Sequence, residues 1–154
     1  MLSLPDCATA ADCAAAVVID TQVVLDWVLF DDPRVQPWAQ AIAAQRVRWI
    51  YTADMRAEAL RVVHYPALAK RFEPQQAAQK LVLAFARWGR CHAAGAAQRR
   101  LSCADADDQM FIDLALARRA AALLSRDRAV LRLARRALEL GLRITTPEQW
   151  LPPG

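Results

Sequence analysis

Residues 14–22 read AAAVVIDTQ, and this stretch decides the fold. Six small or apolar residues, the last three β-branched, run directly into Asp20 and Thr21. A run that is apolar at every position is typical of a strand in the middle of a parallel sheet covered by helices on both faces. Reactive groups collect beyond the carboxyl ends of such strands, where Asp20 would lie. Asp20 is therefore a candidate site residue, although aspartate is also a preferred helix cap.

Strand-like and helix-like segments alternate along the rest of the chain. Helical periodicity predicts helices at 23–30, 35–45, 53–64, 74–92, 109–119 and 128–140. Short apolar or β-branched runs predict strands at 48–52, 120–125 and 142–145, with another short strand at 99–103. This order predicts an α/β fold of three layers, α/β/α, around a central parallel sheet of four to five strands.

The length of 154 residues suits one domain, which we expect at 16–152 after an N-terminal extension at 1–15. No run approaches the roughly 18 apolar residues of a membrane span, so no membrane partner is expected. Residues 1–13 carry two aspartates and no basic residue, unlike the charged start of a secretory signal. We therefore expect a cytoplasmic protein.

The amino-acid composition indicates which partners and which kinds of site the chain can have. The net charge of +4 is compatible with a nucleic-acid or acidic partner, but supports RNA only weakly. The four cysteines form no C-x-x-C pair, so neither a zinc site nor a disulfide framework is indicated. His64 and His92 are the only histidines, which argues against histidine-based RNA cleavage. The five tryptophans are interpreted as core or dimer contacts, with stacking on RNA bases as the alternative.

Three further acids can reach the same edge of the sheet as Asp20. They are Glu58, beside the apolar stripe of one predicted helix, Asp108, at the start of another, and Asp127, after an apolar strand. Four carboxylates this close would repel one another and raise their pKa values unless a cation neutralised them. Oxygen ligands suit Mg²⁺ or Mn²⁺, which can activate water and stabilise charge on a phosphate. The pattern implies phosphodiester hydrolysis, with these four acids as catalytic and metal-binding residues.

The acids also have plainer explanations. Glu58 could pair with one of the many arginines, because an unpaired buried carboxylate is costly. Asp105 and Asp107 lie beside Asp108, and helix capping explains part of this cluster. We interpret both as solvated loop acids, with metal binding through water as the alternative.

Several segments together resemble the PIN domain, in particular the PIN-like (VapC-like) toxins of bacterial toxin–antitoxin systems. They are VVIDTQVVLDWVLF at 17–30, AEALRVVHYPALAKRF at 57–72, DADDQMFIDLALA at 105–117, LLSRDRAVL at 123–131 and ITTPEQWL at 144–151. The resemblance implies a ribonuclease that uses Mg²⁺ or Mn²⁺, acts on RNA, is held inactive by a cognate antitoxin and forms a homodimer. It carries the four family acids, in order, onto Asp20, Glu58, Asp108 and Asp127.

The chain departs from the family pattern at the edges of this site. Gln22 replaces the usual asparagine, so a hydrogen bond that orients Asp20 is lost or remade. Arg126 replaces the usual glycine before the fourth acid, and Ala129 replaces an acid two positions after it. Arg126 could contact a substrate phosphate or form a salt bridge. Thr21 is expected to support the site through its hydroxyl, with helix capping as the alternative.

The leading interpretation is therefore a metal-dependent endoribonuclease, the toxin of a toxin–antitoxin pair. The alternative is a catalytically impaired PIN fold that acts as an RNA-binding or antitoxin-binding module. A phosphatase or phosphotransferase of the dehalogenase type also places an aspartate after its first strand. It would need a second aspartate where Gln22 stands and a lysine near the later acids, where the chain has none.

Overall fold

Five parallel strands form one sheet in the order β3-β2-β1-β4-β5. The computed structural model describes residues 14–96 and 101–153, and the account below concerns those residues. The strands are β1 (Ala15–Ile19), β2 (Val47–Tyr51), β3 (Gly89–Cys91), β4 (Ala122–Leu124) and β5 (Arg143–Thr145). The predicted α/β class and all-parallel sheet are confirmed. The predicted N-terminal extension at 1–15 falls almost wholly outside the described residues.

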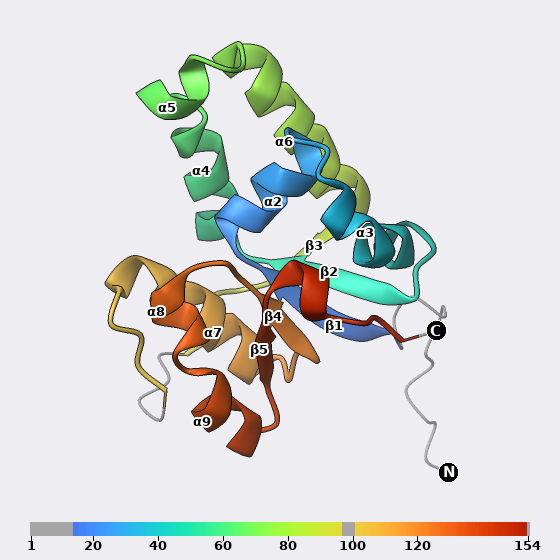
Figure 1. Cartoon of the computed structure of the whole chain (residues 1–154), viewed down its shortest axis with the longest axis vertical. Coiled ribbons are helices and arrows are strands. Elements are labelled where there is room, and N and C mark those ends of the chain that lie inside the picture. Colours follow the sequence, from blue (N-terminus) through green and yellow to red (C-terminus); the bar gives the residue numbers. More distant parts are fainter. Residues whose placement is uncertain (1–13, 97–100, 154) are drawn as a thin grey trace.

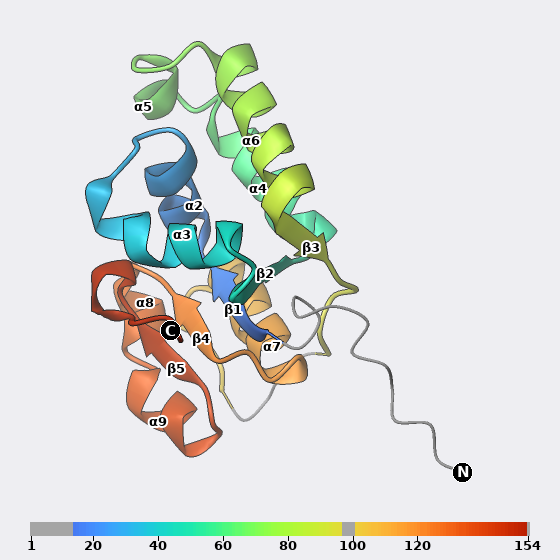
Figure 2. The same cartoon turned by 90° about the vertical axis from the view of Figure 1, so that its right-hand side faces the viewer.

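Helices cover both faces of this sheet (Figures 1 and 2). The helices between β1 and β3 lie on one side: α2 (Thr21–Val28), η1 (Pro33–Val35), α3 (Gln36–Ala43), α4 (Ala53–Val62), α5 (Pro66–Ala69) and α6 (Pro74–Trp88). The later segments are η2 (Ala106–Asp108), α7 (Gln109–Ala117), α8 (Arg128–Leu131), α9 (Ala134–Glu139) and η3 (Pro147–Gln149). Helices α7 and α9 pack on the opposite side, α7 against β1 and β4 and α9 against β5.

The strand order reverses between β1 and β4. These two strands pair in parallel, with Ile19 opposite Leu124. From β1 the chain runs outward to β2 and β3, then returns to the other side of β1 as β4. Such a reversal opens a crevice beyond the carboxyl ends of the two strands, where ligands of α/β proteins bind. Asp20 and Asp127 both lie just past those ends.

The core confirms that β1 is a buried central strand. Val17 and Val18 are fully buried, as expected for a strand covered on both faces. Trp38 and Trp49 are among the largest fully buried side chains, and Trp27 packs edge-on against both rings. These three tryptophans therefore pack together in the core. No helix in the described part of the chain is both long enough and apolar enough to cross a membrane.

The predicted third strand was wrong. Of the stretch 99–103, residues 101–103 form no strand, and 99–100 lie outside the described residues. The third strand is instead Gly89–Cys91, which the helical pattern had included in a helix ending at His92. Gly89 ends α6 in an extended conformation, with φ −92° and ψ 156°. A Cβ here would lie 2.5 Å from Cε1 of Tyr51, so only glycine lets this turn pack against β2.

The single helix predicted at 128–140 is also interrupted. It consists of α8 and α9, separated at Arg132 and Leu133. The amide of Leu133 donates to the carbonyl of Val130, three residues back, so the turn tightens between the two segments. The apolar positions continue at helical spacing across the interruption, which explains why periodicity alone did not reveal it.

Candidate active site

Asp20 and Asp127 are brought together by the pairing of β1 with β4. The amide of Asp20 donates to the carbonyl of Leu124 across the two strands, at 2.9 Å. Asp20 also caps α2, since its Oδ1 accepts from the amide of Thr21 at 2.7 Å. Asp127 caps α8 by accepting from the amide of Ala129 at 2.8 Å. The capping explanation for Asp20 is therefore correct, and both acids cap a helix while they lie at the sheet edge.

Ser125 joins these two acids, and the sequence analysis missed it. Its side chain is fully buried, and its hydroxyl donates to Oδ2 of Asp20 at 2.6 Å. The same oxygen accepts from the amide of Asp127 at 3.0 Å. One side chain therefore fixes the orientation of the first acid and the start of the loop that carries the fourth. The available signal was a hydroxyl at the end of an apolar strand, two residues before Asp127.

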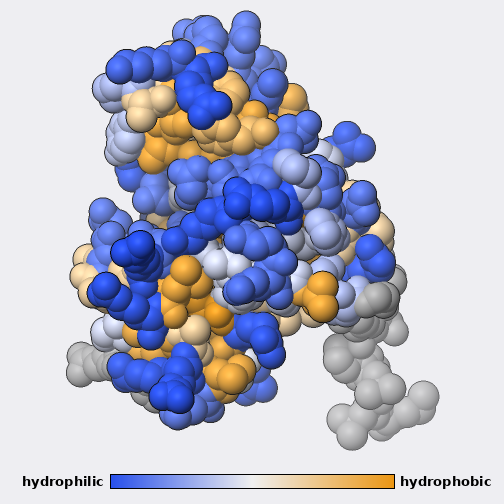
Figure 3. All heavy atoms as spheres, viewed as in Figure 1, coloured by the Kyte–Doolittle hydropathy of each residue, from blue (hydrophilic) through white to orange (hydrophobic). Residues whose placement is uncertain are grey.

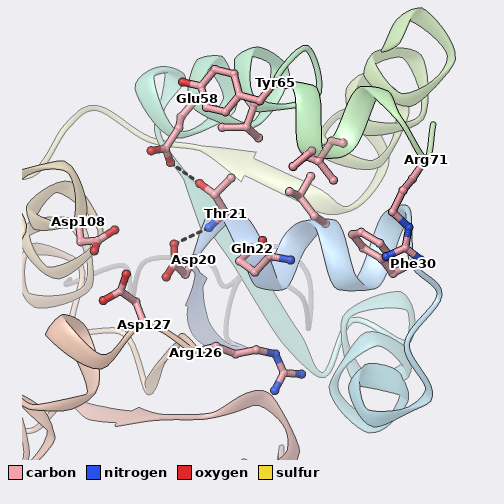
Figure 4. A pocket seen from close by; sticks show the side chains of 14 residues that line it. Asp20, Thr21, Gln22, Phe30, Glu58, Tyr65, Arg71, Asp108, Arg126 and Asp127 are labelled. Carbon is pink, nitrogen blue, oxygen red and sulfur yellow. Dashed lines mark hydrogen bonds between the residues drawn. The ribbon is translucent and has the colours of Figure 1, made fainter. Parts of the chain in front are cut away.

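Glu58 approaches the site from α4. This helix begins at Thr52, whose hydroxyl accepts from the amide of Met55 at 3.3 Å. Glu58 Oε2 accepts a hydrogen bond from the hydroxyl of Thr21, directly after Asp20 (Figure 4). Within the described ranges Glu58 forms no ion pair, so the arginine alternative is not what the structure contains. Thr21 thus links the first and second acids, since its amide donates to Asp20 and its hydroxyl donates to Glu58.

Asp108 is the least satisfied of the four acids. It is 9% exposed, and its Oδ2 is buried with no hydrogen-bond partner among the described residues. One carboxylate oxygen from each of Asp105, Asp108 and Asp127 lies within 4.8 Å of the others. Asp105, interpreted from sequence as a solvated loop acid, is exposed but stands in this group. Asp107 does not belong to it.

All four predicted acids line a single cavity of about 670 Å³. Figure 4 shows Asp20, Glu58, Asp108 and Asp127 facing the same space from separate segments of the chain. Thr21, Gln22 and Arg126 line it as well. The structure therefore brings the four predicted acids to one cavity, and of these Asp108 and Asp127 belong to the tight oxygen group with Asp105.

Burial and mutual repulsion raise the pKa of two of these carboxyl groups. Burial is the larger cause for Asp108, and the charges of Asp20 and Asp127 add to it, so that its pKa rises to about 7. The pKa of Asp20 rises to about 6, again mainly through burial. The hydrogen bond from Ser125 opposes that rise by stabilising the ionised form. Both groups would be partly protonated near neutral pH unless a cation were present.

These features fit a hard divalent cation. Every charged ligand in the group is a carboxylate oxygen, the donor type that Mg²⁺ and Mn²⁺ prefer. The unpartnered oxygen of Asp108 lacks the hydrogen bond that buried polar atoms almost always make. A bound cation would satisfy that oxygen and would favour the ionised form of Asp20 and Asp108. Asp20, Glu58, Asp108 and Asp127 would hold the ion, with Asp105 available beside them.

Arg126 and Gln22 contact acidic residues other than the four acids of the cavity. Arg126 Nε donates to Oδ2 of Asp26 at 2.8 Å, and a second nitrogen lies 2.8 Å from a Glu148 oxygen. A third contact joins Arg126 to Asp32 at 3.6 Å. The salt-bridge alternative for Arg126 is therefore correct. Gln22 donates to the other oxygen of Asp26 at 3.0 Å, so its amide orients Asp26 rather than Asp20.

Comparison with known families decides the identity of this fold. A family model described as the PIN domain matches residues 16–129, from β1 to the start of α8. The chain belongs to the PIN domain family. The match includes all four acids that line the cavity described above, which we call the PIN cavity. PIN domains are generally nucleases that use divalent metal ions. A search of curated proteins finds no match to the chain.

Proposed function

We propose that this PIN domain is a metal-dependent endoribonuclease that hydrolyses RNA phosphodiester bonds. The observation that carries the proposal is the unpartnered Oδ2 of Asp108 among acids that line one cavity. When bound there, Mg²⁺ or Mn²⁺ would activate water and offset the charge that develops on the phosphate. The family match, which spans all four acids, supports a nuclease.

The residues around the acids hold them in place. Ser125 orients Asp20, and Thr21 holds Glu58, so two hydroxyls fix two carboxylates without adding charge. Arg126 is paired with three acids outside the cluster and would keep the loop before Asp127 in position. Arg126 therefore acts in this proposal as a positioning residue, while the four acids would hold the metal ion.

The biological setting is a further part of the proposal. The resemblance of the four acidic motifs to PIN-like toxins supports a cytoplasmic toxin that forms a homodimer and is neutralised by a cognate antitoxin. The alternative is an impaired PIN fold that binds RNA or an antitoxin without cutting. It draws support from Gln22, whose amide contacts Asp26 and leaves Asp20 to Ser125.

Cleavage of a mixed single-stranded RNA pool separates these two functions. Purified protein would be assayed with Mg²⁺, Mn²⁺ or EDTA, beside an Asp108→Asn variant prepared in the same way. The nuclease proposal predicts cutting with either metal, none in EDTA and a loss of at least about 100-fold in the variant. Folded protein that cuts with neither metal would favour the binding module. Cutting that survives both EDTA and the substitution would contradict the acidic site.

A further inference from the structure

The cavity extends well beyond the four acids. Its volume of about 670 Å³ lies within the range of pockets that enclose a ligand of drug size, far more than one hydrated ion requires. The part away from Asp108 and Asp127 is walled by α2, α4 and α5 and ends at Phe30 and Arg71 (Figure 4). Figure 3 shows hydrophobic surface gathered over this upper part of the molecule, around α5 and the adjoining ends of α4 and α6.

Two side chains of this wall have the chemistry that unpaired nucleotides bind. Tyr65, between α4 and α5, lines the cavity and is 50% exposed, so its ring is accessible to a ligand. Arg71 places its guanidinium carbon 4.8 Å from the centre of the Phe30 ring. Phe30 in turn packs edge-on against Phe72 at 5.1 Å, so the arginine rests on a supported aromatic face.

The two arginines that line the cavity, Arg71 and Arg126, differ in their ion pairs. Arg126, the other arginine of the cavity, is already paired with Asp26, Asp32 and Glu148. No ion pair of Arg71 is found within residues 14–96 and 101–153. A cation at the end of a cavity whose other end is acidic would attract a phosphate group to that end.

We propose that the wall from Tyr65 to Arg71 is a subsite for one unpaired RNA nucleotide beside the bond that is cut, with its base against Tyr65 and a phosphate at Arg71. This inference rests on the proposed ribonuclease function, because it places the nucleotide in the same cavity as the acids. Aromatic rings that stack bases, together with arginines that contact phosphates, are the usual components of single-strand RNA sites. The subsite would require a splayed base, which excludes a continuous duplex from this cavity.

RNA binding tests the subsite separately from cutting. Fluorescence anisotropy with a short labelled single-stranded RNA would be measured in EDTA. Every protein would carry Asp108→Asn, which removes one repelling charge and silences metal-dependent cutting. In that background, Tyr65→Ala should weaken binding about fivefold or more, whereas Tyr65→Phe should retain it. Arg71→Gln should weaken binding and lower the dependence of log affinity on log salt concentration by about one.

Matched controls come from the neighbouring helices α4 and α6. Arg61 is an exposed arginine of α4, and Leu83 is an exposed apolar residue of α6; neither lines the cavity. Arg61→Gln and Leu83→Ala should leave binding within about twofold of the background, because surface substitutions away from a site have small effects. Equal losses in Arg61→Gln and Arg71→Gln would mean that only the overall charge matters, and would overturn the subsite.

The outcomes distinguish the subsite from the nuclease function. If the native chain cuts RNA but Tyr65→Ala and Arg71→Gln bind normally, the subsite is wrong, the nuclease stands and this wall is open to a protein partner. If the native chain cuts nothing while binding still depends on Tyr65 and Arg71, the subsite stands and the nuclease falls. Absence of RNA binding in folded background protein would overturn the subsite.

Discussion

The hydroxyl of Ser125 donates a 2.6 Å hydrogen bond to Oδ2 of Asp20, although 105 residues separate the two in sequence. The bond crosses from the end of β4 to the end of β1, the two strands between which the order of the sheet reverses. Ser125 thereby turns the pairing of two strands into a fixed orientation of the first acid. The acidic site depends on this contact as well as on the acids themselves.

Replacing Ser125 with alanine should weaken metal binding while the fold is retained. Partners that orient a metal ligand typically contribute about 10- to 100-fold to affinity or activity. Because the lost bond stabilises ionised Asp20, the substitution should also move the pH dependence of metal binding to higher pH. Isothermal titration with Mn²⁺ at several pH values would measure both effects. Ser125→Thr, which keeps the hydroxyl, should restore most of the affinity; equal losses in both variants would contradict an orienting role.

The stability of the metal-free protein should fall as pH rises from about 4 to about 7. Asp20 and Asp108 have folded-state pKa values of about 6 and about 7, above the value of 3.8 for the unconstrained group. Between those limits the unfolded chain has released protons that the folded chain still holds, so each pH increase favours unfolding. Below 3.8 both states are protonated and the penalty from these groups is absent.

Asp108→Asn is the matched variant for this pH effect. It removes one titrating group from a buried position, so in EDTA near pH 7 it should raise the free energy of unfolding by about 1–2 kcal/mol. The fall in stability between pH 4 and pH 7 should also become shallower. Urea unfolding followed by circular dichroism would report both. A variant that is less stable than the native chain at pH 7 in EDTA would mean that the Asp108 charge is already compensated.

Metal affinity should have the opposite dependence on pH. Binding requires ionised carboxylates, so protons leave Asp20 and Asp108 when an ion binds. Affinity for Mn²⁺ should therefore rise as pH increases through about 6 to 7, by up to tenfold per pH unit for each proton released. Titrations in buffers with different ionisation enthalpies would count the released protons. Affinity that is flat from pH 5.5 to 8 would contradict the raised pKa values.

Arg126→Gln should destabilise the folded protein by about 1–3 kcal/mol. The substitution removes the partner of Asp26, a residue only 9% exposed, and leaves a buried carboxylate without its cation. Arg128→Gln is the control, because Arg128 is two residues away, exposed and outside this network; its effect should stay within about 0.5 kcal/mol. Chemical unfolding of the two variants measures the difference. Equal stabilities would show that the ion pairs of Arg126 contribute nothing measurable.

The positions of three acids could be predicted from sequence because Asp20, Asp108 and Asp127 each stand at a junction between elements. Asp20 and Asp127 follow apolar runs, and parallel strands bring their carboxyl ends to one edge whatever the details of packing. The contacts that orient the acids could not be predicted in this way. Ser125 reaches Asp20, and Arg126 reaches Asp26, across about 100 residues of chain. Such pairs follow from which strands are neighbours, a property that local periodicity does not contain.

The errors in secondary structure arose where local patterns gave the wrong signal. The strand Gly89–Cys91 follows directly after α6 and is only three residues long. It lies at the edge of the sheet, so it lacks the apolar run that marks a central strand. In the neighbouring strand, the ring of Tyr51 leaves no room for a Cβ at residue 89, so this strand can pack there because residue 89 is glycine. Tertiary packing therefore decided this element.

The central claim is that the carboxylates of the PIN cavity form a divalent-metal site in which Asp108 is a ligand. Isothermal titration with Mn²⁺ tests it directly, by comparing native protein with Asp108→Asn. Asp54→Asn, at an exposed position of α4, is the control. The account predicts saturable binding to the native chain and the control, and at least about tenfold weaker binding to Asp108→Asn. Equal affinity in native protein and Asp108→Asn, or no saturable binding to either, would contradict it.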